Sequence, residues 1–338
     1  MARSYNVAVV GATGIVGEVF LDILEKRPFP LGSLKLLASE RSAGRKLRFG
    51  EQEIEVEALT PASLAGCDLA FISATDEISR EYAPIAAKAG AVAIDDSGVW
   101  RMDPAVPLVV PEINAADVDQ HKGILAIPNC STTPLVMTLW PVHQVNAVKR
   151  VTAATYQSVS GTGRAAMEEL AANTRQAIAG EEVVPRVYPH SIAFNLLPEI
   201  GSWKDEDYTS EEWKVVNETR KIMHAPDIKI ATTCVRVPVY VSLSAAVHVE
   251  LTDPMTPAEF RGILSRAPGV VVQDDPEASV YPTPSDAAGK DPVFAGRIRR
   301  DLSTENGIVY WVVGDNLRKG AALNALQIAE ELIARKLI

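Results

Sequence analysis

The sequence has few cysteines, no long hydrophobic run and no excess of basic charge, and each absence excludes a class of protein. Three cysteines in 338 residues, Cys67, Cys130 and Cys234, are too few for a disulfide framework and fit a reducing compartment. No apolar run reaches the roughly 18 residues of a membrane span. A net charge of −10 argues against a nucleic-acid partner, which requires a basic surface. We therefore expect a cytoplasmic protein that binds neither membranes nor nucleic acids.

Repeats and low-complexity segments are also lacking, and the chain begins almost directly with a strand-like run at residues 6–10. No signal peptide or transit segment is therefore expected. Hydrophobic residues make up 47% and charged residues 22%, a balance typical of a globular protein with a substantial core. The length favours two domains.

The first 128 residues alternate short apolar runs with helical periodicity. Strands are predicted at residues 6–10, 34–38, 68–73 and 91–95, and helices after residue 14 and at 78–89. This alternation predicts βαβ units and a Rossmann-type, doubly wound parallel sheet in an α/β protein. We expect residues 1–128, joined by 316–338, to form this nucleotide-binding domain. An amphipathic helix at 319–337 is expected to return to it.

Residues 129–315 have a different pattern. Strands are predicted at 151–158, 228–240 and 244–251, and helices at 163–178 and 211–224. These elements indicate an α+β domain with a largely antiparallel sheet. Residues 273–291 are rich in Pro, Asp, Ser and Gly and predict a surface loop region.

The first strand is followed by three glycines in a GxxGxxG arrangement, Gly11, Gly14 and Gly17. This spacing is related to the GxGxxG dinucleotide fingerprint without matching it. Glycines allow a tight turn and a close approach of the backbone to a pyrophosphate, and the helix that follows offers free N–H groups. The pattern favours a nucleotide site over a purely structural turn.

The end of the second predicted strand distinguishes NAD from NADP. It contains both an acid, Glu40, and a base, Arg41, followed by Ser42. An acid at this place binds the ribose 2′-hydroxyl, whereas an arginine binds a 2′-phosphate. Because Arg41 is flanked by two hydroxyls, we favour NADP. The alternative is that Arg41 is an ordinary solvated loop charge.

Cys130 lies where an apolar run leads into a predicted helix. A helix N-terminus stabilises a thiolate, so this is a suitable position for a nucleophile. The alternative is a small buried cysteine, which is how Cys67 and Cys234 are interpreted because they lie inside apolar runs.

The chain resembles the aspartate-semialdehyde dehydrogenase family over essentially its full length. The matching segments, in order, are GATGIVG from Gly11, LASERSAG from Leu37, WRMDPAVPLVVPEIN from Trp100, PNCSTTPLVM from Pro128, TYQSVSGTGRAAMEEL from Thr155, IAFNLLPEIG from Ile192, YTSEEWKVVNETRKIM from Tyr208, CVRVPV from Cys234 and GDNLRKGAALNALQIAEEL from Gly314. The resemblance implies reductive dephosphorylation of L-aspartyl 4-phosphate by NADPH, an early step toward lysine, threonine and methionine. It also implies a homodimer built through the second domain.

The resemblance further implies roles for individual residues. Cys130 would attack the acyl phosphate and form a thioester. The implied substrate residues are Arg101 and Lys214 for phosphate, Glu211 for the ammonium group or for orienting Lys214, Arg236 for the α-carboxylate, and Gln157 and Asn129 for the acyl group. The implied cofactor residues are Gly11, Thr13, Gly14, Ile15 and Val16 at the pyrophosphate, Arg41 and Ser42 at the 2′-phosphate, and Ser73, Ser160, Gly161 and Asn316. No metal is implied.

The chain departs from the family pattern after CVRVPV. The family places a Gly-His-Ser-Glu-Ala type sequence there, whose histidine is the acid/base partner of the cysteine. Counting from Arg236, that position holds Leu243, and Ser242 and Ala245 replace the glycine and the glutamate. His248 lies five residues beyond Leu243, and an odd offset along a strand points it to the opposite face.

The departure leaves two main interpretations. The first is a working but slowed dehydrogenase, which the joint retention of Cys130, Gln157, Glu211, Lys214 and Arg236 favours. The second is a paralogue that binds NADPH in a sensing or scaffolding role. A related acyl-phosphate or acyl-CoA reductase would share the thioester chemistry, but an amino-acid phosphate suits the charged set better.

Overall fold

The computed structural model describes residues 3–338, and these form two compact units. The first comprises residues up to Asn129 together with Ala321–Ile338, and the second comprises Cys130–Gly320. The expected boundaries at 128/129 and 315/316 differ from these by one and five residues. Residues 316–320 group with the second unit because the Asn316 side chain is hydrogen-bonded inside it.

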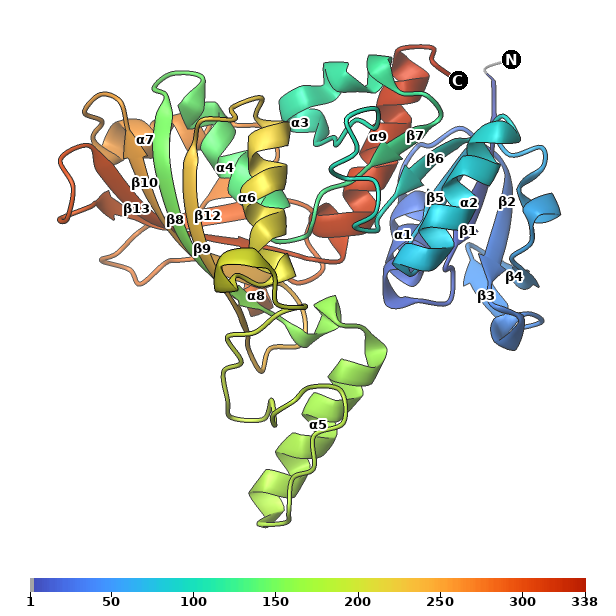
Figure 1. Cartoon of the computed structure of the whole chain (residues 1–338), viewed down its shortest axis with the longest axis horizontal. Helices are drawn as coiled ribbons and strands as arrows, with labels where there is room; N and C mark the ends of the chain where they lie inside the picture. The colour runs from blue at the N-terminus through green and yellow to red at the C-terminus, as the bar shows by residue number, and fades with distance from the viewer. Residues whose placement is uncertain (1–2) are drawn as a thin grey trace. The chain divides into compact units, whose positions relative to one another are not determined.

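The first unit contains a seven-stranded sheet in the order β3-β4-β2-β1-β5-β6-β7 (Figure 1). The strands are β1 (Tyr5–Val10), β2 (Leu31–Ala38), β3 (Lys46–Phe49), β4 (Gln52–Ala58), β5 (Leu69–Ile72), β6 (Val92–Asp95) and β7 (Ile124–Ala126). All pairings are parallel except the β3–β4 hairpin. Strand order reverses at β1, which lies between β2 and β5, and such a switch point is where doubly wound sheets bind ligands.

Helices cover both faces of this sheet. They are α1 (Ile15–Lys26), α2 (Asp76–Lys88), α3 (Pro111–Asn114) and α9 (Leu323–Ala334), with short η1 (Glu40–Ser42), η2 (Pro61–Leu64) and η3 (Ala115–Gln120). One apolar core joins α1 and α9 to one face, through Phe20 and Leu326 among others. A separate core joins α2 to the other face, through Ala83 and Ala86. The predicted doubly wound α/β architecture is therefore confirmed.

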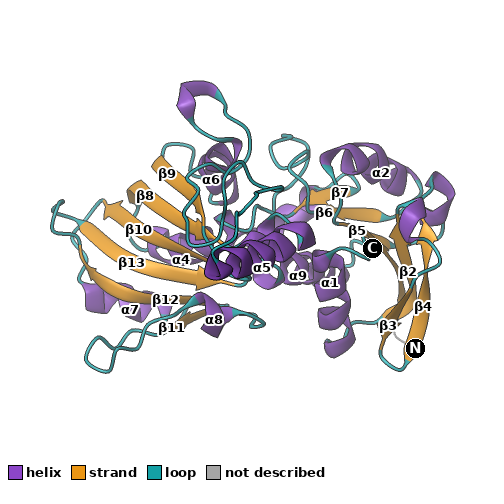
Figure 2. Ribbon diagram, turned by 90° about the horizontal axis from the view of Figure 1, so that it is seen from below, coloured by secondary structure: helices purple, strands orange, loops and turns teal. Residues whose placement is uncertain are grey.

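The second unit contains a six-stranded mixed sheet in the order β11-β12-β13-β10-β8-β9 (Figure 2). Its strands are β8 (Val148–Gln157), β9 (Lys229–Arg236), β10 (Leu243–Leu251), β11 (Val270–Val272), β12 (Val293–Arg300) and β13 (Gly307–Gly314). The three central pairings are antiparallel and the two outer ones are parallel. The strand predicted at 228–240 ends at Arg236, because Pro238 has no backbone N–H to donate to a ladder.

The helices of this unit are α4 (Thr132–His143), α5 (Arg164–Ala179), α6 (Ser210–Ile222), α7 (Pro257–Leu264) and α8 (Pro284–Ala287), with short η4 (Val159–Gly161) and η5 (Asp205–Asp207) and a π-helical turn, η6 (Arg318–Ala322), at its end. Helices α4, α6 and α7 pack against the sheet, while α5 extends away from it (Figure 1). The 273–291 segment is not all loop, since it contains α8 with its Thr283 cap. No helix among residues 3–338 is both long enough and apolar enough to span a membrane.

Candidate active site

The turn between β1 and α1 explains the three glycines of the first motif. Gly11 has a φ of +83°, and a Cβ added there would lie 2.0 Å from the Ser73 carbonyl oxygen. A Cβ on Gly17 would lie 2.4 Å from the Gly11 carbonyl oxygen, and Gly14 is the N-cap of α1. Only glycine fits at Gly11 and Gly17. The turn therefore exposes the N-terminus of α1, over Ile15 and Val16, as an anion-binding cradle that fits a dinucleotide pyrophosphate.

The residues expected near the 2′-phosphate lie beside this turn. The Thr13 hydroxyl donates to the Ser42 hydroxyl across 3.5 Å, which joins the glycine motif to η1, the turn that follows β2. Arg41 lies in η1 and is exposed. Ser73 follows β5 at the switch point of the sheet and donates to Asp96 Oδ2 at 3.0 Å. The first unit thus brings together the predicted residues of its own half of the cofactor site.

Arg101 is a buried cation, with a relative exposure of only 5%. Its Nη2 donates to the Asp96 carbonyl oxygen at 2.7 Å and lies 4.0 Å from Asp96 Oδ1. Asn129, at the end of the first unit, is also buried. A buried guanidinium held by backbone is a typical element of an anion site, and it is not an ordinary solvated surface charge.

Cys130 is half-buried and lies two residues before α4, whose N-cap is Ser131. A Cβ added to Gly320 would lie 2.9 Å from Cys130 Cβ, so the cysteine packs tightly against the end of the second unit. The other two cysteines are buried. Burial raises the pKa of the Cys67 thiol, and it raises the pKa of Cys234 to about 12. Cys67 and Cys234 are therefore buried thiols, as the sequence predicted, whereas Cys130 is partly exposed.

Four predicted or neighbouring residues form a row across one end of the sheet. Arg236 on β9 pairs with Gln157 on β8, Gln157 pairs with Leu243 on β10, and Leu243 pairs with Gly314 on β13. A Cβ on Gly314 would lie 3.5 Å from Pro134 Cβ, in the first turn of α4. This row therefore ends beside the helix that Cys130 precedes.

The charged residues of this unit are held in place. Arg236 is buried and its Nη1 donates to the Ser158 carbonyl oxygen at 2.7 Å. A Cβ on Gly161 would lie 3.0 Å from the same nitrogen. Lys214 Nζ lies 3.2 Å from Glu211 Oε2, an ion pair that their three-residue spacing on α6 allows.

Asn316 is the centre of a polar cluster that the sequence did not reveal. Its Oδ1 accepts from the hydroxyls of Ser158 and Ser160, at 3.2 and 3.1 Å, and from the backbone N–H of Ser242 at 2.8 Å. Ser160 and Asn316 were predicted as cofactor residues, whereas Ser158 and Ser242 were not. The partners are separated by more than 70 residues in the sequence, so no local sequence pattern predicts these contacts.

The structure agrees with the prediction that Leu243 and His248, an odd number of residues apart on one strand, point to opposite faces. Leu243 is buried, whereas the His248 side chain is 49% exposed and its Nδ1 lies 3.1 Å from Asp301 Oδ2. Ser242 has a φ of +75°, which favours glycine, and its buried hydroxyl has no hydrogen-bond partner. The row thus contains neither a histidine nor another ionisable group between Arg236 and Gly314.

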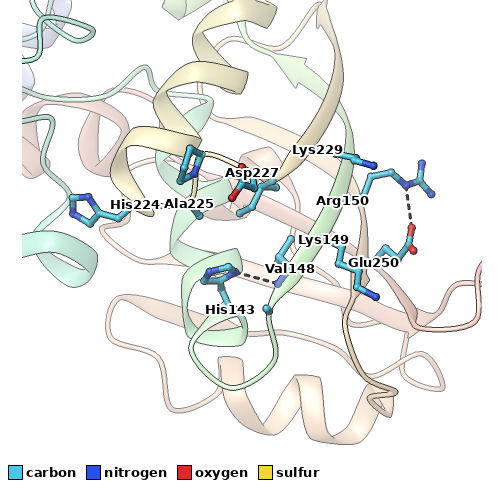
Figure 3. Close-up of a pocket in the computed structure, with 12 residues that line it drawn as sticks. His143, Val148, Lys149, Arg150, His224, Ala225, Asp227, Lys229 and Glu250 are labelled. Atoms are coloured by element: carbon cyan, nitrogen blue, oxygen red, sulfur yellow. Dashed lines mark hydrogen bonds and ion pairs between the residues drawn. The ribbon is translucent and has the colours of Figure 1, made fainter.

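A cavity of about 730 Å³ opens at the other end of the same strands (Figure 3). Its polar lining includes His143, Lys149, Arg150, Lys229 and Glu250. Arg150 and Gln157 are seven residues apart on β8, which corresponds to roughly 20 Å along an extended strand. This cavity therefore contains none of the predicted site residues.

Both domains of the chain are similar to those of semialdehyde dehydrogenases. A model of the NAD-binding domain of semialdehyde dehydrogenases matches residues 6–121, and a model of their dimerisation domain matches residues 139–319. The chain is 47% identical to the aspartate-semialdehyde dehydrogenase of Bacillus subtilis (strain 168), over 98% of both chains. It is 50% identical to that of Aquifex aeolicus (strain VF5), over 99% of both. The chain belongs to the aspartate-semialdehyde dehydrogenase family.

A solved structure supports the same assignment. The crystal structure of aspartate semialdehyde dehydrogenase II from Vibrio cholerae, complexed with ASA, matches with a TM-score of 0.96 at 42% identity. The match covers 98% of this chain and 99% of that chain. The fold is therefore that of the family over nearly its whole length.

Proposed function

We propose that this protein is an NADP-dependent aspartate-semialdehyde dehydrogenase that reduces L-aspartyl 4-phosphate to L-aspartate 4-semialdehyde. The observation that carries the proposal is the position of Cys130, a half-buried thiol just before the N-terminus of α4 in a chain of this family. A helix N-terminus favours the thiolate, which is the reacting form of cysteine.

In the first step the Cys130 sulfur attacks the acyl carbon of the substrate. A C–S bond forms, the bond from that carbon to the phosphate oxygen breaks, and phosphate leaves with the electron pair. Arg101 and Lys214 bind the leaving phosphate, Arg236 binds the α-carboxylate, and Gln157 and Asn129 position the acyl group. The thioester on Cys130 is more electrophilic than an oxygen ester, which prepares it for reduction.

The nicotinamide cofactor fits the β1–α1 turn, where Gly11 and Gly17 leave no room for a side chain. When bound, it supplies the hydride for reduction of the acyl carbon. Arg41 and Ser42 select the 2′-phosphate of NADP. The remaining contacts to the cofactor come from Ser73, Ser160, Gly161 and Asn316. Release of the aldehyde returns Cys130 to its thiolate form.

The enzyme is slowed because Leu243 stands where an acid/base histidine belongs. A positioned acid/base group contributes about 10²–10⁴-fold to such reactions, and leucine cannot hold a proton. The retained set of Cys130, Gln157, Lys214 and Arg236 preserves binding and nucleophilic attack.

By its likeness to the family we place the protein in the cytoplasm as a homodimer, on the route to lysine, threonine and methionine.

The buried Leu243 specifically favours one second candidate, a paralogue that binds NADPH in a sensing or scaffolding role. The reverse reaction separates the two. With aspartate semialdehyde, NADP and phosphate, the dehydrogenase forms NADPH and the Cys130→Ser protein does not. Equal absence of NADPH from both proteins, with NADPH binding intact, favours the paralogue and overturns the proposal.

A further inference from the structure

A carboxylate that the mechanism does not use lies against the proposed phosphate-binding arginine. Asp96 directly follows β6, and its Oδ1 is 4.0 Å from Arg101 Nη2. Their side chains are only 17% and 6% exposed. The same Arg101 nitrogen donates to the Asp96 carbonyl oxygen at 2.7 Å, which keeps the two groups together. An anion bound by Arg101 is therefore repelled by Asp96 whenever that carboxylate is ionised.

The neighbouring Asp95 is held very differently. Its two oxygens accept from the hydroxyls of Ser79 and Ser97 and from the Ser97 backbone N–H. Within residues 3–338, the Asp96 carboxylate accepts a single hydrogen bond, from the Ser73 hydroxyl at 3.0 Å. A carboxylate that loses its hydration on burial and accepts so few hydrogen bonds in return is poorly stabilised in its charged form.

Asp96 consequently changes its charge near neutrality. Burial raises its pKa to about 7, against the opposing influence of Arg101 and the Ser73 hydroxyl, and Asp95 adds to the rise. Among the described residues, the charged groups that act on Asp96 are Arg101, which lowers its pKa, and Asp95, which raises it. On helix α2, Ser79 donates to Asp95 and Asp76 accepts from the Gly98 backbone N–H.

We propose that Asp96 sets the anion affinity of Arg101: protonated Asp96 leaves more of the guanidinium charge to a bound phosphate group, and ionised Asp96 offsets more of it. The inference rests on the proposed function through the assignment of Arg101 to phosphate. Asp96 acts through Arg101 and is a positioning residue. Two consequences follow: anion affinity falls as the pH rises through about 7, and anion binding takes up a proton.

Sulfate is the appropriate probe because it stays a dianion across neutral pH, whereas phosphate itself titrates there. Equilibrium dialysis of radiolabelled sulfate against the full-length protein, at constant ionic strength, should show affinity falling about tenfold between about pH 6 and pH 8.5. Asp96→Asn, which keeps the shape of the side chain, should bind with the low-pH affinity throughout. Glu55→Gln removes the same charge from an exposed position on β4 and should keep the wild-type slope.

Arg101→Ala distinguishes failure of this inference from failure of the proposed site. If sulfate binding is unchanged in Arg101→Ala, the assignment of Arg101 to phosphate is wrong. If Arg101→Ala loses sulfate but the wild-type affinity does not vary with pH, the role of Asp96 alone is overturned. A slope that persists in Asp96→Asn also overturns it.

Calorimetry on the unmodified protein keeps the test independent of the variants' folding. The heat of sulfate binding at about pH 7, measured in two buffers of different ionisation enthalpy, gives the protons taken up. Uptake of a substantial fraction of one proton supports the role of Asp96. Binding with no proton uptake contradicts it.

Discussion

Leu243 and Gln157 lie directly opposite each other on the antiparallel strands β10 and β8. Both are buried, and Gln157 is the residue assigned to the acyl group. The register fixes what stands beside that amide, because directly paired residues of a sheet point to the same face. A buried apolar side chain therefore lies next to Gln157, at the position where the proposed function expects a proton-transfer group.

Replacing Leu243 by histidine should restore part of the missing chemistry. We expect kcat of Leu243→His to rise by about tenfold or more. The unmodified enzyme should depend on ionisation of the thiol and speed up as the pH rises, and the variant should show a flatter pH–rate profile. Restoration should be incomplete, because Ser242 and Ala245 also depart from the family pattern and leave the ring without its orienting neighbours.

The matched control for this variant is Leu243→Gln, which adds a polar side chain that cannot transfer a proton. It should not raise kcat. If the unmodified protein already turns over as fast as Leu243→His across neutral pH, another residue supplies the proton transfer and the role given to position 243 is wrong.

Ser242→Gly should stabilise the protein. The serine has a φ of +75° and a buried hydroxyl without a partner, and both features cost free energy that glycine avoids. The greater freedom of glycine in the unfolded chain offsets part of the gain. A net gain of about 1 kcal/mol should raise the thermal midpoint by about 2–4 °C.

Ala245→Gly on β10, the strand that Ser242 precedes, is the comparison for that measurement. It introduces the same flexibility without relieving a positive φ, so it should lower the midpoint. A lower midpoint for both variants would show that Ser242 is not strained.

Arg41→Ala should weaken NADPH binding by about 1–3 kcal/mol, the cost of losing a hydrogen bond to a charged group. NADH lacks the 2′-phosphate, so its affinity should hardly change. Fluorescence titration with both cofactors checks this, with the exposed Arg48→Ala on β3 as a control that should bind as the unmodified protein does. Equal affinities of the unmodified protein for NADPH and NADH would refute the NADP preference.

Arg236→Lys should raise KM for aspartate semialdehyde by about tenfold and change kcat little. A lysine keeps the positive charge but loses the planar fork that binds a carboxylate with two hydrogen bonds. Steady-state kinetics in the reverse direction measure both constants. A fall in kcat with unchanged KM would mean that Arg236 acts on the reacting group and not on the α-carboxylate.

The features that the sequence predicted are those with a local cause. The glycine turn follows from the positive φ of Gly11 and from the contact of Gly17 with the Gly11 carbonyl oxygen, and the Glu211–Lys214 pair follows from helix spacing. The opposed faces of Leu243 and His248 follow from the period of a strand.

Other features could not be predicted because they depend on long-range contacts. The bonds of Asn316 to Ser158 and Ser242 join loops from distant parts of the chain. The β3–β4 hairpin was missed since its alternating apolar residues, such as Leu47 and Ile54, are diluted by charges. Asp96 resembles any acid after a strand until its burial beside Arg101 is known.

The most direct test of the account is the acyl-enzyme itself. The protein is incubated with aspartate semialdehyde and NADP but without phosphate, so that oxidation can load the thiol while release to phosphate is blocked. Intact-mass spectrometry should then show one added aspartyl group, which peptide mapping places on Cys130 and which is absent without NADP and from Cys130→Ser. An unmodified protein that still binds NADP, or an aspartyl group on a residue other than Cys130, would contradict the account.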